Sequence, residues 1–373
     1  MSTLEKAMKF AFFLFVIAFY MMLITANYLG LFFALYIVPR NILLSNPSMH
    51  FGLFVPTYIH LFTISGTSVL LYFYFIVIFL IASFVLLVYF NLKSCIKEIR
   101  ERKRIVIASH NPLLIMGEVF SVIVFITIFY NLFLNVVNVS PAAPEFESAP
   151  LWENMLSLAN AAIYEEFAVR VLFLAIPLFV IQYIRDRKFM WKAFFIGGQK
   201  LDALSAILIL FSSVIFGVAH ALYGWDIYKI FPAFVAGAGF GYLYIKGGFF
   251  ASVLMHFAFD YLDITYMLAT KNVLSPAFEF LAMPGIFIST IVLMFAIAVA
   301  PIVLYGYWKK FMEKYRGMPR SSTAYQKAGR VEGGLISLQF PVGKCPKCGC
   351  EESRYLGWNM LECVRCGEKR KMG

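Results

Sequence analysis

Eight long apolar stretches, separated by short polar segments, run along the chain to about residue 307. Each has room for the roughly 20 apolar residues that an α-helix needs to cross a bilayer. The pattern predicts membrane-spanning helices at about 10–37, 68–92, 113–138, 157–183, 201–222, 227–245, 248–269 and 281–307. The first stretch is too long for a cleaved signal peptide and lacks a small-residue cleavage site, so we interpret it as a helix.

Composition places the chain in the same class. Hydrophobic residues make up 61% of the 373 positions and charged residues only 14%, whereas soluble globular domains carry about 25% charged residues. These values exclude a soluble globular protein and a disordered chain, and the weak alternating segments of about ten residues that mark a membrane β-barrel are absent. We therefore expect an all-α polytopic membrane protein.

The net charge of +11 is concentrated beside predicted spans. Lys93–Arg104 carries a net charge of +4, and the segment from Lys309 to the C-terminus carries +8. In contrast, Pro141–Trp152 contains Glu145 and Glu147 and no basic residue. Basic segments flank membrane spans on the cytoplasmic side. We therefore attribute the excess of basic residues to membrane topology and not to nucleic-acid binding. We predict an integral protein of the cell membrane, in contact with its lipids, with both termini in the cytoplasm.

Changes in composition divide the chain into four parts. They are N-terminal transmembrane helices (1–140), a transmembrane core that carries the polar motifs described below (141–308), a cytoplasmic linker (309–343) and a Cys-rich module (344–373). Glycines near the sixth and seventh spans have structural explanations. Gly237 and Gly241 match the G-x-x-x-G pattern of helix packing, and the pair Gly247-Gly248 is typical of a turn.

Five of the six cysteines lie in the C-terminal module, four of them in two C-x2-C pairs. Cys345 and Cys348 form the first pair and Cys363 and Cys366 the second, with 14 residues between the pairs. Four thiolates at this spacing can surround a tetrahedral Zn²⁺, and a glycine after each pair permits a tight turn. We predict a zinc ribbon with one structural zinc ion, because disulfides are disfavoured in the cytoplasm. The module would either dock a protein or nucleic acid or serve as a metal-stapled tail.

Ionisable side chains interrupt three of the predicted spans. The fourth span contains Glu165, Glu166 and Arg170, the fifth ends at His220, and the seventh contains His256 and Asp260. Charged groups are expensive within a bilayer, so each is a candidate for function. The second glutamate and the arginine stand four positions apart, as do His256 and Asp260, so each pair can meet along one helix face. This leaves Glu165 for another role; the alternative is that the glutamates mark an interfacial helix start.

Bundles turn such residues toward a shared interior, and together they suit the activation of water. A buried glutamate can act as a general base, while histidines orient the water or stabilise an oxyanion. The same side chains would also suit a catalytic Zn²⁺ with an open coordination position, and the sequence leaves that alternative open. Serine and cysteine nucleophiles have no support, because the motifs contain neither residue.

Three motifs in this order resemble those of the CPBP family, which comprises type II CAAX prenyl proteases and bacteriocin-processing enzymes and is also called the ABI family. The segment EEFAVR fits E-E-x-x-x-R, FGVAH fits F-x-x-x-H, and HFAFD fits H-x-x-x-N/D. The resemblance covers about 140–270 and the eight-helix layout, and it does not extend to the zinc ribbon. It implies an intramembrane endopeptidase whose substrate is a membrane-embedded or lipidated protein or peptide.

The resemblance also implies a role for each motif residue. Glu165 would be the general base, Glu166 and Arg170 a supporting pair, His220 a second group that activates the water, and His256 with Asp260 the polar pocket of the tetrahedral intermediate. The best-studied prenyl proteases carry Asn at the last position. As an anion, Asp260 cannot donate to an oxyanion, and it would instead orient His256 or bind a metal.

Two further functions fit the same residues. A non-catalytic membrane scaffold or immunity-type protein would recruit a partner through the zinc ribbon. A proton-coupled transporter would use the buried carboxylates as a relay, although the spans show no inverted repeat with broken helices. The predicted topology places Glu165 and His220 toward the non-cytoplasmic half of the membrane, whereas a prenylated C-terminus would arrive from the cytoplasm. The prenyl-protease name therefore describes the family and not the substrate.

Overall fold

The structure, a computed structural model, describes residues 3–54, 58–101, 111–141, 149–187, 191–222, 224–270, 276–316, 338–339, 348, 352–357, 360–363, 366–367 and 369–371. Its contacts divide into two compact units, Met1–Tyr307 and Trp308–Gly373. The boundary between these units lies beside the predicted start of the linker, and the further boundary at 140 stays a prediction.

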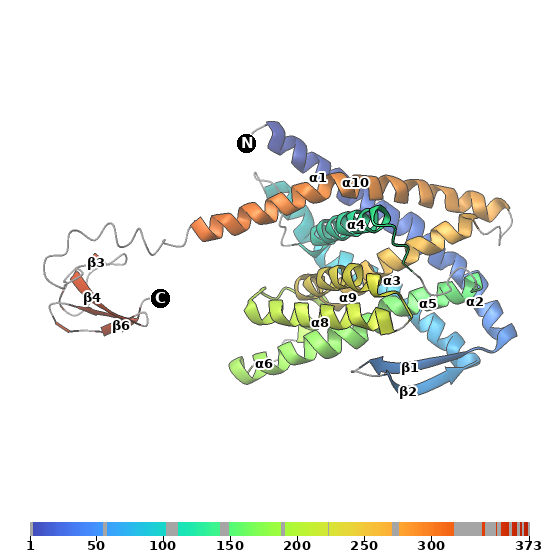
Figure 1. The fold of residues 1–373 in the computed structure, drawn as a ribbon, viewed down its shortest axis with the longest axis horizontal. Coiled ribbons are helices and arrows are strands. Elements are labelled where there is room, and N and C mark those ends of the chain that lie inside the picture. Colours follow the sequence, from blue (N-terminus) through green and yellow to red (C-terminus); the bar gives the residue numbers. More distant parts are fainter. Residues whose placement is uncertain are drawn as a thin grey trace. The chain divides into compact units, whose positions relative to one another are not determined.

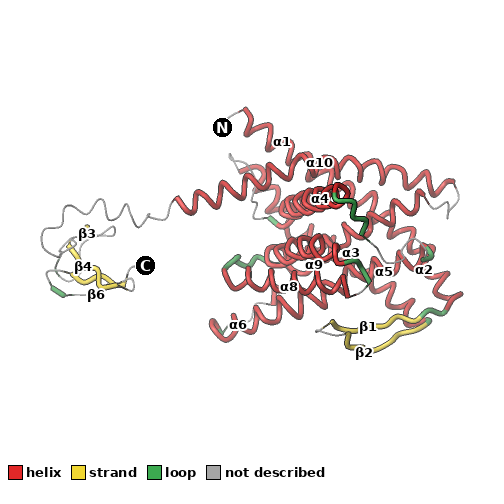
Figure 2. Tube along the Cα trace, in the orientation of Figure 1, coloured by secondary structure: helices red, strands yellow, loops and turns green. Residues whose placement is uncertain are grey.

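The first unit is built almost entirely from helices, which Figure 1 labels and Figure 2 draws in red. The helical elements are α1 (Thr3–Met22), η1 (Leu23–Tyr28), α2 (Leu29–Ser45), α3 (Thr67–Glu101), α4 (Pro112–Val136), α5 (Leu151–Glu165), η2 (Glu166–Ala175), α6 (Ile176–Asp186), α7 (Trp191–Ile196), α8 (Ala203–Leu222), η3 (Ile227–Lys229), α9 (Ile230–Thr270) and α10 (Pro276–Arg316). The segments η1 and η2 are π-helical. Because η1 joins α1 to α2 and η2 joins α5 to α6, each of these groups is one long helical stretch.

Seven helical stretches are long and apolar enough to cross a membrane. They are Phe10–Ser45, Thr67–Arg100, Pro112–Val136, Leu151–Arg185, Ala203–Leu222, Ile227–Thr265 and Ala282–Met312. Many large apolar side chains on them remain exposed, including Phe32, Ile78 and Met294, and apolar exposure on this scale indicates contact with lipid. The chain is therefore an all-α polytopic membrane protein, which confirms the fold class expected from the sequence.

The eight predicted spans correspond to seven stretches because the sixth and seventh spans share α9. At Gly248 the backbone leaves helical geometry, with φ 76° and ψ −170°, where the sequence predicts a turn. The ring of Phe240, before that point, stacks on the ring of His256, after it, with centroids 5.0 Å apart. A straight helix would separate these two positions by about 24 Å, so α9 folds back on itself into two antiparallel arms.

Replacing Gly248 by Ala is expected to lower the free energy of unfolding by about 2–5 kcal/mol, because the new side chain causes both backbone strain and a steric clash. The φ of +76° disfavours any side chain, and a Cβ atom would overlap the backbone of Phe195 and Ile196. The matched control is Gly198→Ala, because Gly198 has φ +84° and no heavy atom within 4 Å of an added Cβ. Thermal melting of the purified proteins in detergent measures both, and equal losses would contradict the predicted clash.

Close packing of α9 on its neighbours follows the glycines of its first arm. A Cβ atom on Gly237 would lie 3.2 Å from the Cα atom of Ser213, and one on Gly241 would lie 3.1 Å from Ile209. Both neighbours belong to α8, which confirms the predicted G-x-x-x-G contact. This contact holds α8, which carries His220 near its C-terminal end, along the first arm of α9.

An antiparallel hairpin, which the apolar pattern did not predict, connects α2 to α3. Its strands are β1 (Ser48–Phe54) and β2 (Tyr58–Ser65), with a register irregularity between Phe51 and Gly52. The strands are rich in aromatic and β-branched residues, which favour extended structure. The Phe51 ring packs edge-on against the rings of Tyr72 and Tyr164, at 5.1 and 5.5 Å between centroids. The hairpin therefore packs against α3 at Tyr72 and against α5 at Tyr164, which directly precedes Glu165.

Two helices continue beyond the predicted spans into basic segments. The helix α3 reaches Glu101 and α10 reaches Arg316, so part of the loop predicted at 93–104 and the start of the linker predicted at 309–343 are helical. Lysine, arginine and glutamate are good helix formers. The apolar pattern marks the membrane-embedded part of a helix, and such residues extend it into water.

The second unit contains a small antiparallel sheet in the order β3 (Leu338–Gln339), β4 (Glu352–Gly357), β5 (Met360–Cys363) and β6 (Lys369–Lys371). Cys348 and Cys366 lie in turns, and Gly367 has φ +71°, as a tight turn after the second Cys pair requires. Cys345 lies outside the described residues, and the side chain of Cys363 is not described. The zinc ion therefore stays a prediction.

Candidate active site

The two glutamates of the E-E-x-x-x-R motif lie where α5 changes into the π-helical segment η2. Glu165 is the last residue of α5, and Glu166 is the first residue of η2. The wider turn of a π-helix alters the direction in which successive side chains point, and such segments are frequent at functional sites. The transition gives the two adjacent carboxylates different surroundings. The sequence contained no clear signal for this change of helix type.

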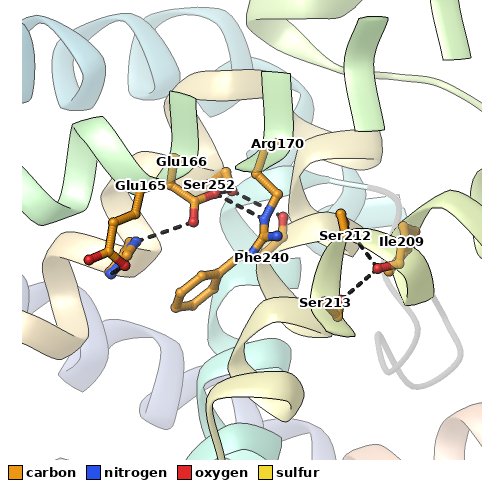
Figure 3. Close-up of polar contacts among 9 residues, drawn as sticks. Glu165, Glu166, Arg170, Ile209, Ser212, Ser213, Phe240 and Ser252 are labelled. Carbon is orange, nitrogen blue, oxygen red and sulfur yellow. Dashed lines mark hydrogen bonds and ion pairs between the residues drawn. The ribbon is translucent and has the colours of Figure 1, made fainter. Parts of the chain in front are cut away.

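Glu166 and Arg170 form an ion pair that is sealed inside the bundle. Arg170 Nε lies 3.3 Å from Glu166 Oε2, and both side chains are 0% exposed. The Ser252 hydroxyl also donates to Glu166, as Figure 3 shows. The guanidinium carbon of Arg170 lies 4.9 Å from the centroid of the Phe216 ring, a cation–π distance. Among the described residues, no acceptor takes a hydrogen bond from the two terminal nitrogens of Arg170.

Neighbouring polar groups on α8 do not extend this pair. The hydroxyl groups of Ser212 and Ser213 bond back to the Ile209 carbonyl oxygen at 3.0 and 2.6 Å, as Figure 3 shows. Each hydroxyl hydrogen is thus used within its own helix. Among the described residues, Glu166 is the carboxylate that forms an ion pair with Arg170.

His256 on the second arm of α9 stands between three carboxylates. Its Nδ1 atom lies 3.2 Å from Glu166 Oε1, and its Nε2 atom lies 3.2 Å from Asp260 Oδ2 and 3.8 Å from Glu165 Oε2. Ionised carboxylates only accept hydrogen bonds. N–H groups of the His256 ring are therefore placed to donate to these carboxylates and hold them together.

Glu165 and Asp260 are the carboxylates that remain accessible. The Glu165 side chain is 36% exposed and that of Asp260 is 23% exposed, whereas Glu166 is 0% exposed. In Figure 3 the Glu165 side chain points away from the Glu166–Arg170 pair. A substrate or a water molecule can therefore reach Glu165, and the sealed pair behind it is shielded. The two glutamates, which the sequence shows as neighbours, are separated into an accessible group and an enclosed one.

His220 reaches the same cluster from the end of α8. Its Nδ1 atom lies 2.8 Å from the Phe216 carbonyl oxygen; since a carbonyl only accepts, Nδ1 carries a hydrogen, and the neutral form of the ring has its lone pair on Nε2. The Phe216 ring contacts the rings of both His220 (4.7 Å) and His256 (5.7 Å). His220 also interacts electrostatically with His256 and Asp260. The structure thus brings all six predicted residues to one region.

Three further residues complete this region. Phe216 is the first residue of the F-x-x-x-H motif, but sequence reasoning gave none of the three a role. Phe216 and Phe240 enclose the arginine and His256, and Ser252 bonds to Glu166. Ser252 stands four positions before His256, as Asp260 stands four after it, so helical spacing offered a signal. The Ser252 side chain is fully buried.

A catalytic metal ion was left open by the sequence. Within the part of the chain that the structure describes, no group of three or more His, Cys, Asp or Glu side chains is arranged to hold a metal ion. The two predicted roles for Asp260 were orientation of His256 and metal ligation. Its 3.2 Å contact with His256 Nε2 favours orientation.

The β1–β2 hairpin is fastened to α5 by Tyr164. The Tyr164 hydroxyl accepts a hydrogen bond from the Gly52 N–H group at 2.9 Å and donates one to the Gly52 carbonyl oxygen. We expect Tyr164→Phe to lower the free energy of unfolding by about 1–2 kcal/mol, because two bonds to one partner are lost. Thermal melting checks this value, with Tyr74→Phe, an exposed tyrosine of α3, as control. Identical melting temperatures for the two variants would show that the bonds do not fasten the hairpin.

Comparison with curated proteins and with solved structures gives no significant match. A family model does match part of the chain. The matched segment, residues 147–262, contains all six motif residues together with Phe216, Phe240 and Ser252. The family model is described as "Type II CAAX prenyl endopeptidase Rce1-like". The match supports the resemblance to the CPBP family.

Proposed function

We propose that the protein is an intramembrane endopeptidase that hydrolyses a peptide bond of a membrane-associated protein or peptide. The observation that carries the proposal is the difference between the two adjacent glutamates. Glu165 is accessible and lies 3.8 Å from His256 Nε2, while Glu166 is enclosed and paired with Arg170. An accessible carboxylate fixed by a rigid polar cluster suits a general base.

In the proposed reaction, a water molecule lies between the Glu165 carboxylate and the Nε2 lone pair of His220. Glu165 takes a proton from this water as its oxygen attacks the carbonyl carbon of the scissile bond. The resulting tetrahedral intermediate collapses as the C–N bond breaks, and the proton on Glu165 passes to the leaving amine nitrogen. Water addition therefore yields a new carboxylate and a new amine without a covalent enzyme intermediate.

The remaining motif residues hold the base in place. Asp260 and Glu166 bind opposite nitrogens of His256, which fixes the ring next to Glu165. The Glu166–Arg170 pair anchors this arrangement to η2. A group held by such a second layer of contacts keeps the geometry that catalysis needs. The alternative way to activate the water is a metal ion bound by these side chains.

The substrate class follows from the location of the site in a membrane protein. The matched family is named for CAAX prenyl endopeptidases, so prenylated C-terminal peptides are the first candidates to test. The predicted topology, with the site toward the non-cytoplasmic half, also favours testing peptides that enter from the other side. We include both kinds in the proposed substrate class of membrane-associated proteins and peptides.

Quantitative proteomics of membranes from cells that carry the wild-type protein or Glu165→Gln tests the proposal. We expect at least one membrane-associated protein to accumulate uncut in the variant, and the purified wild-type protein to cleave it in proteoliposomes. The proposal is wrong if no protein accumulates and no membrane peptide is cleaved. Loss of protein stability in the variant without any accumulating substrate would favour the scaffold alternative.

We further propose that the second unit binds one structural zinc ion through Cys345, Cys348, Cys363 and Cys366. Three features support this proposal: four cysteine thiolates at zinc-ligand spacing, the antiparallel sheet, and the positive φ of Gly367 directly after Cys366. Elemental analysis of the purified protein is expected to give about one zinc per chain, and a Cys348→Ser/Cys366→Ser variant to lose it. The control is Cys95→Ser in α3. Zinc retained by the double variant would refute the proposed site.

A further inference from the structure

The proposed hydrolysis, on which this inference rests, requires one turn of α9 to be held in place. That turn begins at His256, whose Nε2 atom lies 3.8 Å from Glu165 Oε2, and ends at Asp260. A displacement of about 1 Å in such a site can lower the rate by a factor of about 10². The contacts described above reach the turn from η2, through Glu166, and from the first arm of α9, through Phe240. The other sides of the turn need support as well.

A buried asparagine from the N-terminal part of the chain binds the backbone of this turn. Asn27 belongs to the π-helical segment η1 and is 0% exposed. Its Nδ2 atom donates to the carbonyl oxygens of Phe257 at 2.9 Å and of Ala258 at 3.1 Å. These two residues directly follow His256, and a carbonyl oxygen that accepts within a helix has a second lone pair for such a bond. The Asn27 amide therefore fixes the backbone that carries His256.

The residues on either side of Asn27 contact the same arm of α9. The ring of Tyr28 packs edge-on against the ring of Phe257, with centroids 5.5 Å apart. About two helical turns further along α9, the Thr265 hydroxyl donates to the Ala26 carbonyl oxygen at 3.0 Å. Both π-helical segments thus hold this arm, η2 through the ring of the motif histidine and η1 through the backbone that follows it.

Stability alone gives little reason for an asparagine at this position. Asn27 lies near the midpoint of the stretch Phe10–Ser45, which is long and apolar enough to cross a membrane, and polar side chains are expensive there. Its Oδ1 atom has no hydrogen-bond partner among the described residues, and an unpaired buried acceptor is destabilising. Hydrogen bonds between membrane helices contribute only modestly to stability. The two bonds to α9 are therefore explained better by their effect on geometry.

We propose that Asn27 is a positioning residue, which holds His256 and Asp260 at the distances from Glu165 that hydrolysis requires. Because Asn27 is 0% exposed, it acts through the α9 backbone and not on the substrate. Without its amide, the turn can shift, and the 3.8 Å contact between His256 and Glu165 is no longer fixed. The segment that the family model matches, 147–262, does not include Asn27, so the N-terminal helices contribute to the proposed site as well.

The test compares Asn27→Leu with Thr265→Val on the substrate that accumulates in Glu165→Gln cells. Each variant removes hydrogen bonding between η1 and the second arm of α9 and places an apolar side chain of similar size in a buried position. Thr265, however, lies beyond the turn from His256 to Asp260. We expect the two melting temperatures to fall by similar amounts. Asn27→Leu is expected to lower kcat about 10–10²-fold with KM within about threefold, whereas Thr265→Val should keep kcat within about threefold.

A double variant separates positioning from a general loss of stability. If Asn27 acts through His256, Asn27→Leu/His256→Ala should be about as active as His256→Ala alone, because the group that the amide positions is already gone. Should Asn27→Leu fail to fold, Asn27→Ser allows the same comparisons. The serine side chain is shorter, and its hydroxyl can bond to a carbonyl oxygen of its own helix.

Two results would overturn the inference. One is an equal loss of kcat in Asn27→Leu and Thr265→Val, which would show that activity only follows stability. The other is a loss in the His256→Ala background as large as that in the wild-type background. Normal kcat in Asn27→Leu while Glu165→Gln is inactive would overturn this inference alone; full activity of Glu165→Gln would overturn the proposed base.

Discussion

Glu165→Gln is expected to lower kcat by about 10²–10⁴-fold, the range found when a general base is removed. The amide keeps the size and shape of the side chain and cannot take a proton from water. Because Glu165 is 36% exposed and its nearest charged contact is the 3.8 Å approach to His256, the fold should tolerate the change. We therefore expect the melting temperature to stay close to that of the wild-type protein while cleavage in proteoliposomes is lost.

The matched control for this result is Glu153→Gln. Glu153 lies in the first turn of the same helix, α5, and is exposed. It is expected to retain full activity, so a loss confined to Glu165→Gln reports on the carboxylate of the site. Full peptidase activity of purified Glu165→Gln would show that another group activates the water.

Arg170→Leu is expected to have the largest effect on stability, a loss of about 3–5 kcal/mol in the free energy of unfolding. Removal of one partner leaves the other charge buried without compensation, and here Glu166 is 0% exposed and 3.3 Å from the arginine. The lost stacking on Phe216 adds to the penalty. Thermal melting of the purified variant, together with its yield in the membrane, measures this effect.

Two comparisons make the Arg170 prediction specific. Arg100→Leu removes an exposed arginine near the end of α3 and is expected to change the melting temperature little. Glu166→Leu combined with Arg170→Leu removes both buried charges, so it should be less destabilising than Arg170→Leu alone. A double variant that is as unstable as the sum of the two single variants would contradict a buried, coupled pair.

The sequence predicted the helical elements well because crossing a bilayer imposes a length and an apolar composition on each helix. The turn in α9 was also predictable, since two adjacent glycines separated two apolar stretches, and Gly248 takes the positive φ that favours glycine. The π-helical segment η2 and the β1–β2 hairpin were not predictable in this way. Both depend on contacts with other elements, such as the bonds between Tyr164 and Gly52, which leave no period in the sequence.

The candidate site shows the same division between local and tertiary information. Helical spacing pairs Glu166 with Arg170 and His256 with Asp260. It contains no distance between one pair and the other, and the structure joins them through the 3.2 Å contact from Glu166 to His256. The different exposure of Glu165 and Glu166 likewise arises from tertiary packing.

The central claim is that Glu165 and His220 act on the same water molecule, and a double-mutant cycle in kcat/KM tests it most directly. The cycle compares wild type, Glu165→Gln, His220→Asn and the double variant on one substrate, in an assay sensitive enough to follow the product of both losses. The effects of groups that act as a unit are strongly non-additive. We therefore predict that the double variant has a kcat/KM only slightly below that of the less active single variant. Losses that multiply would show that the two side chains act independently and would contradict a shared water.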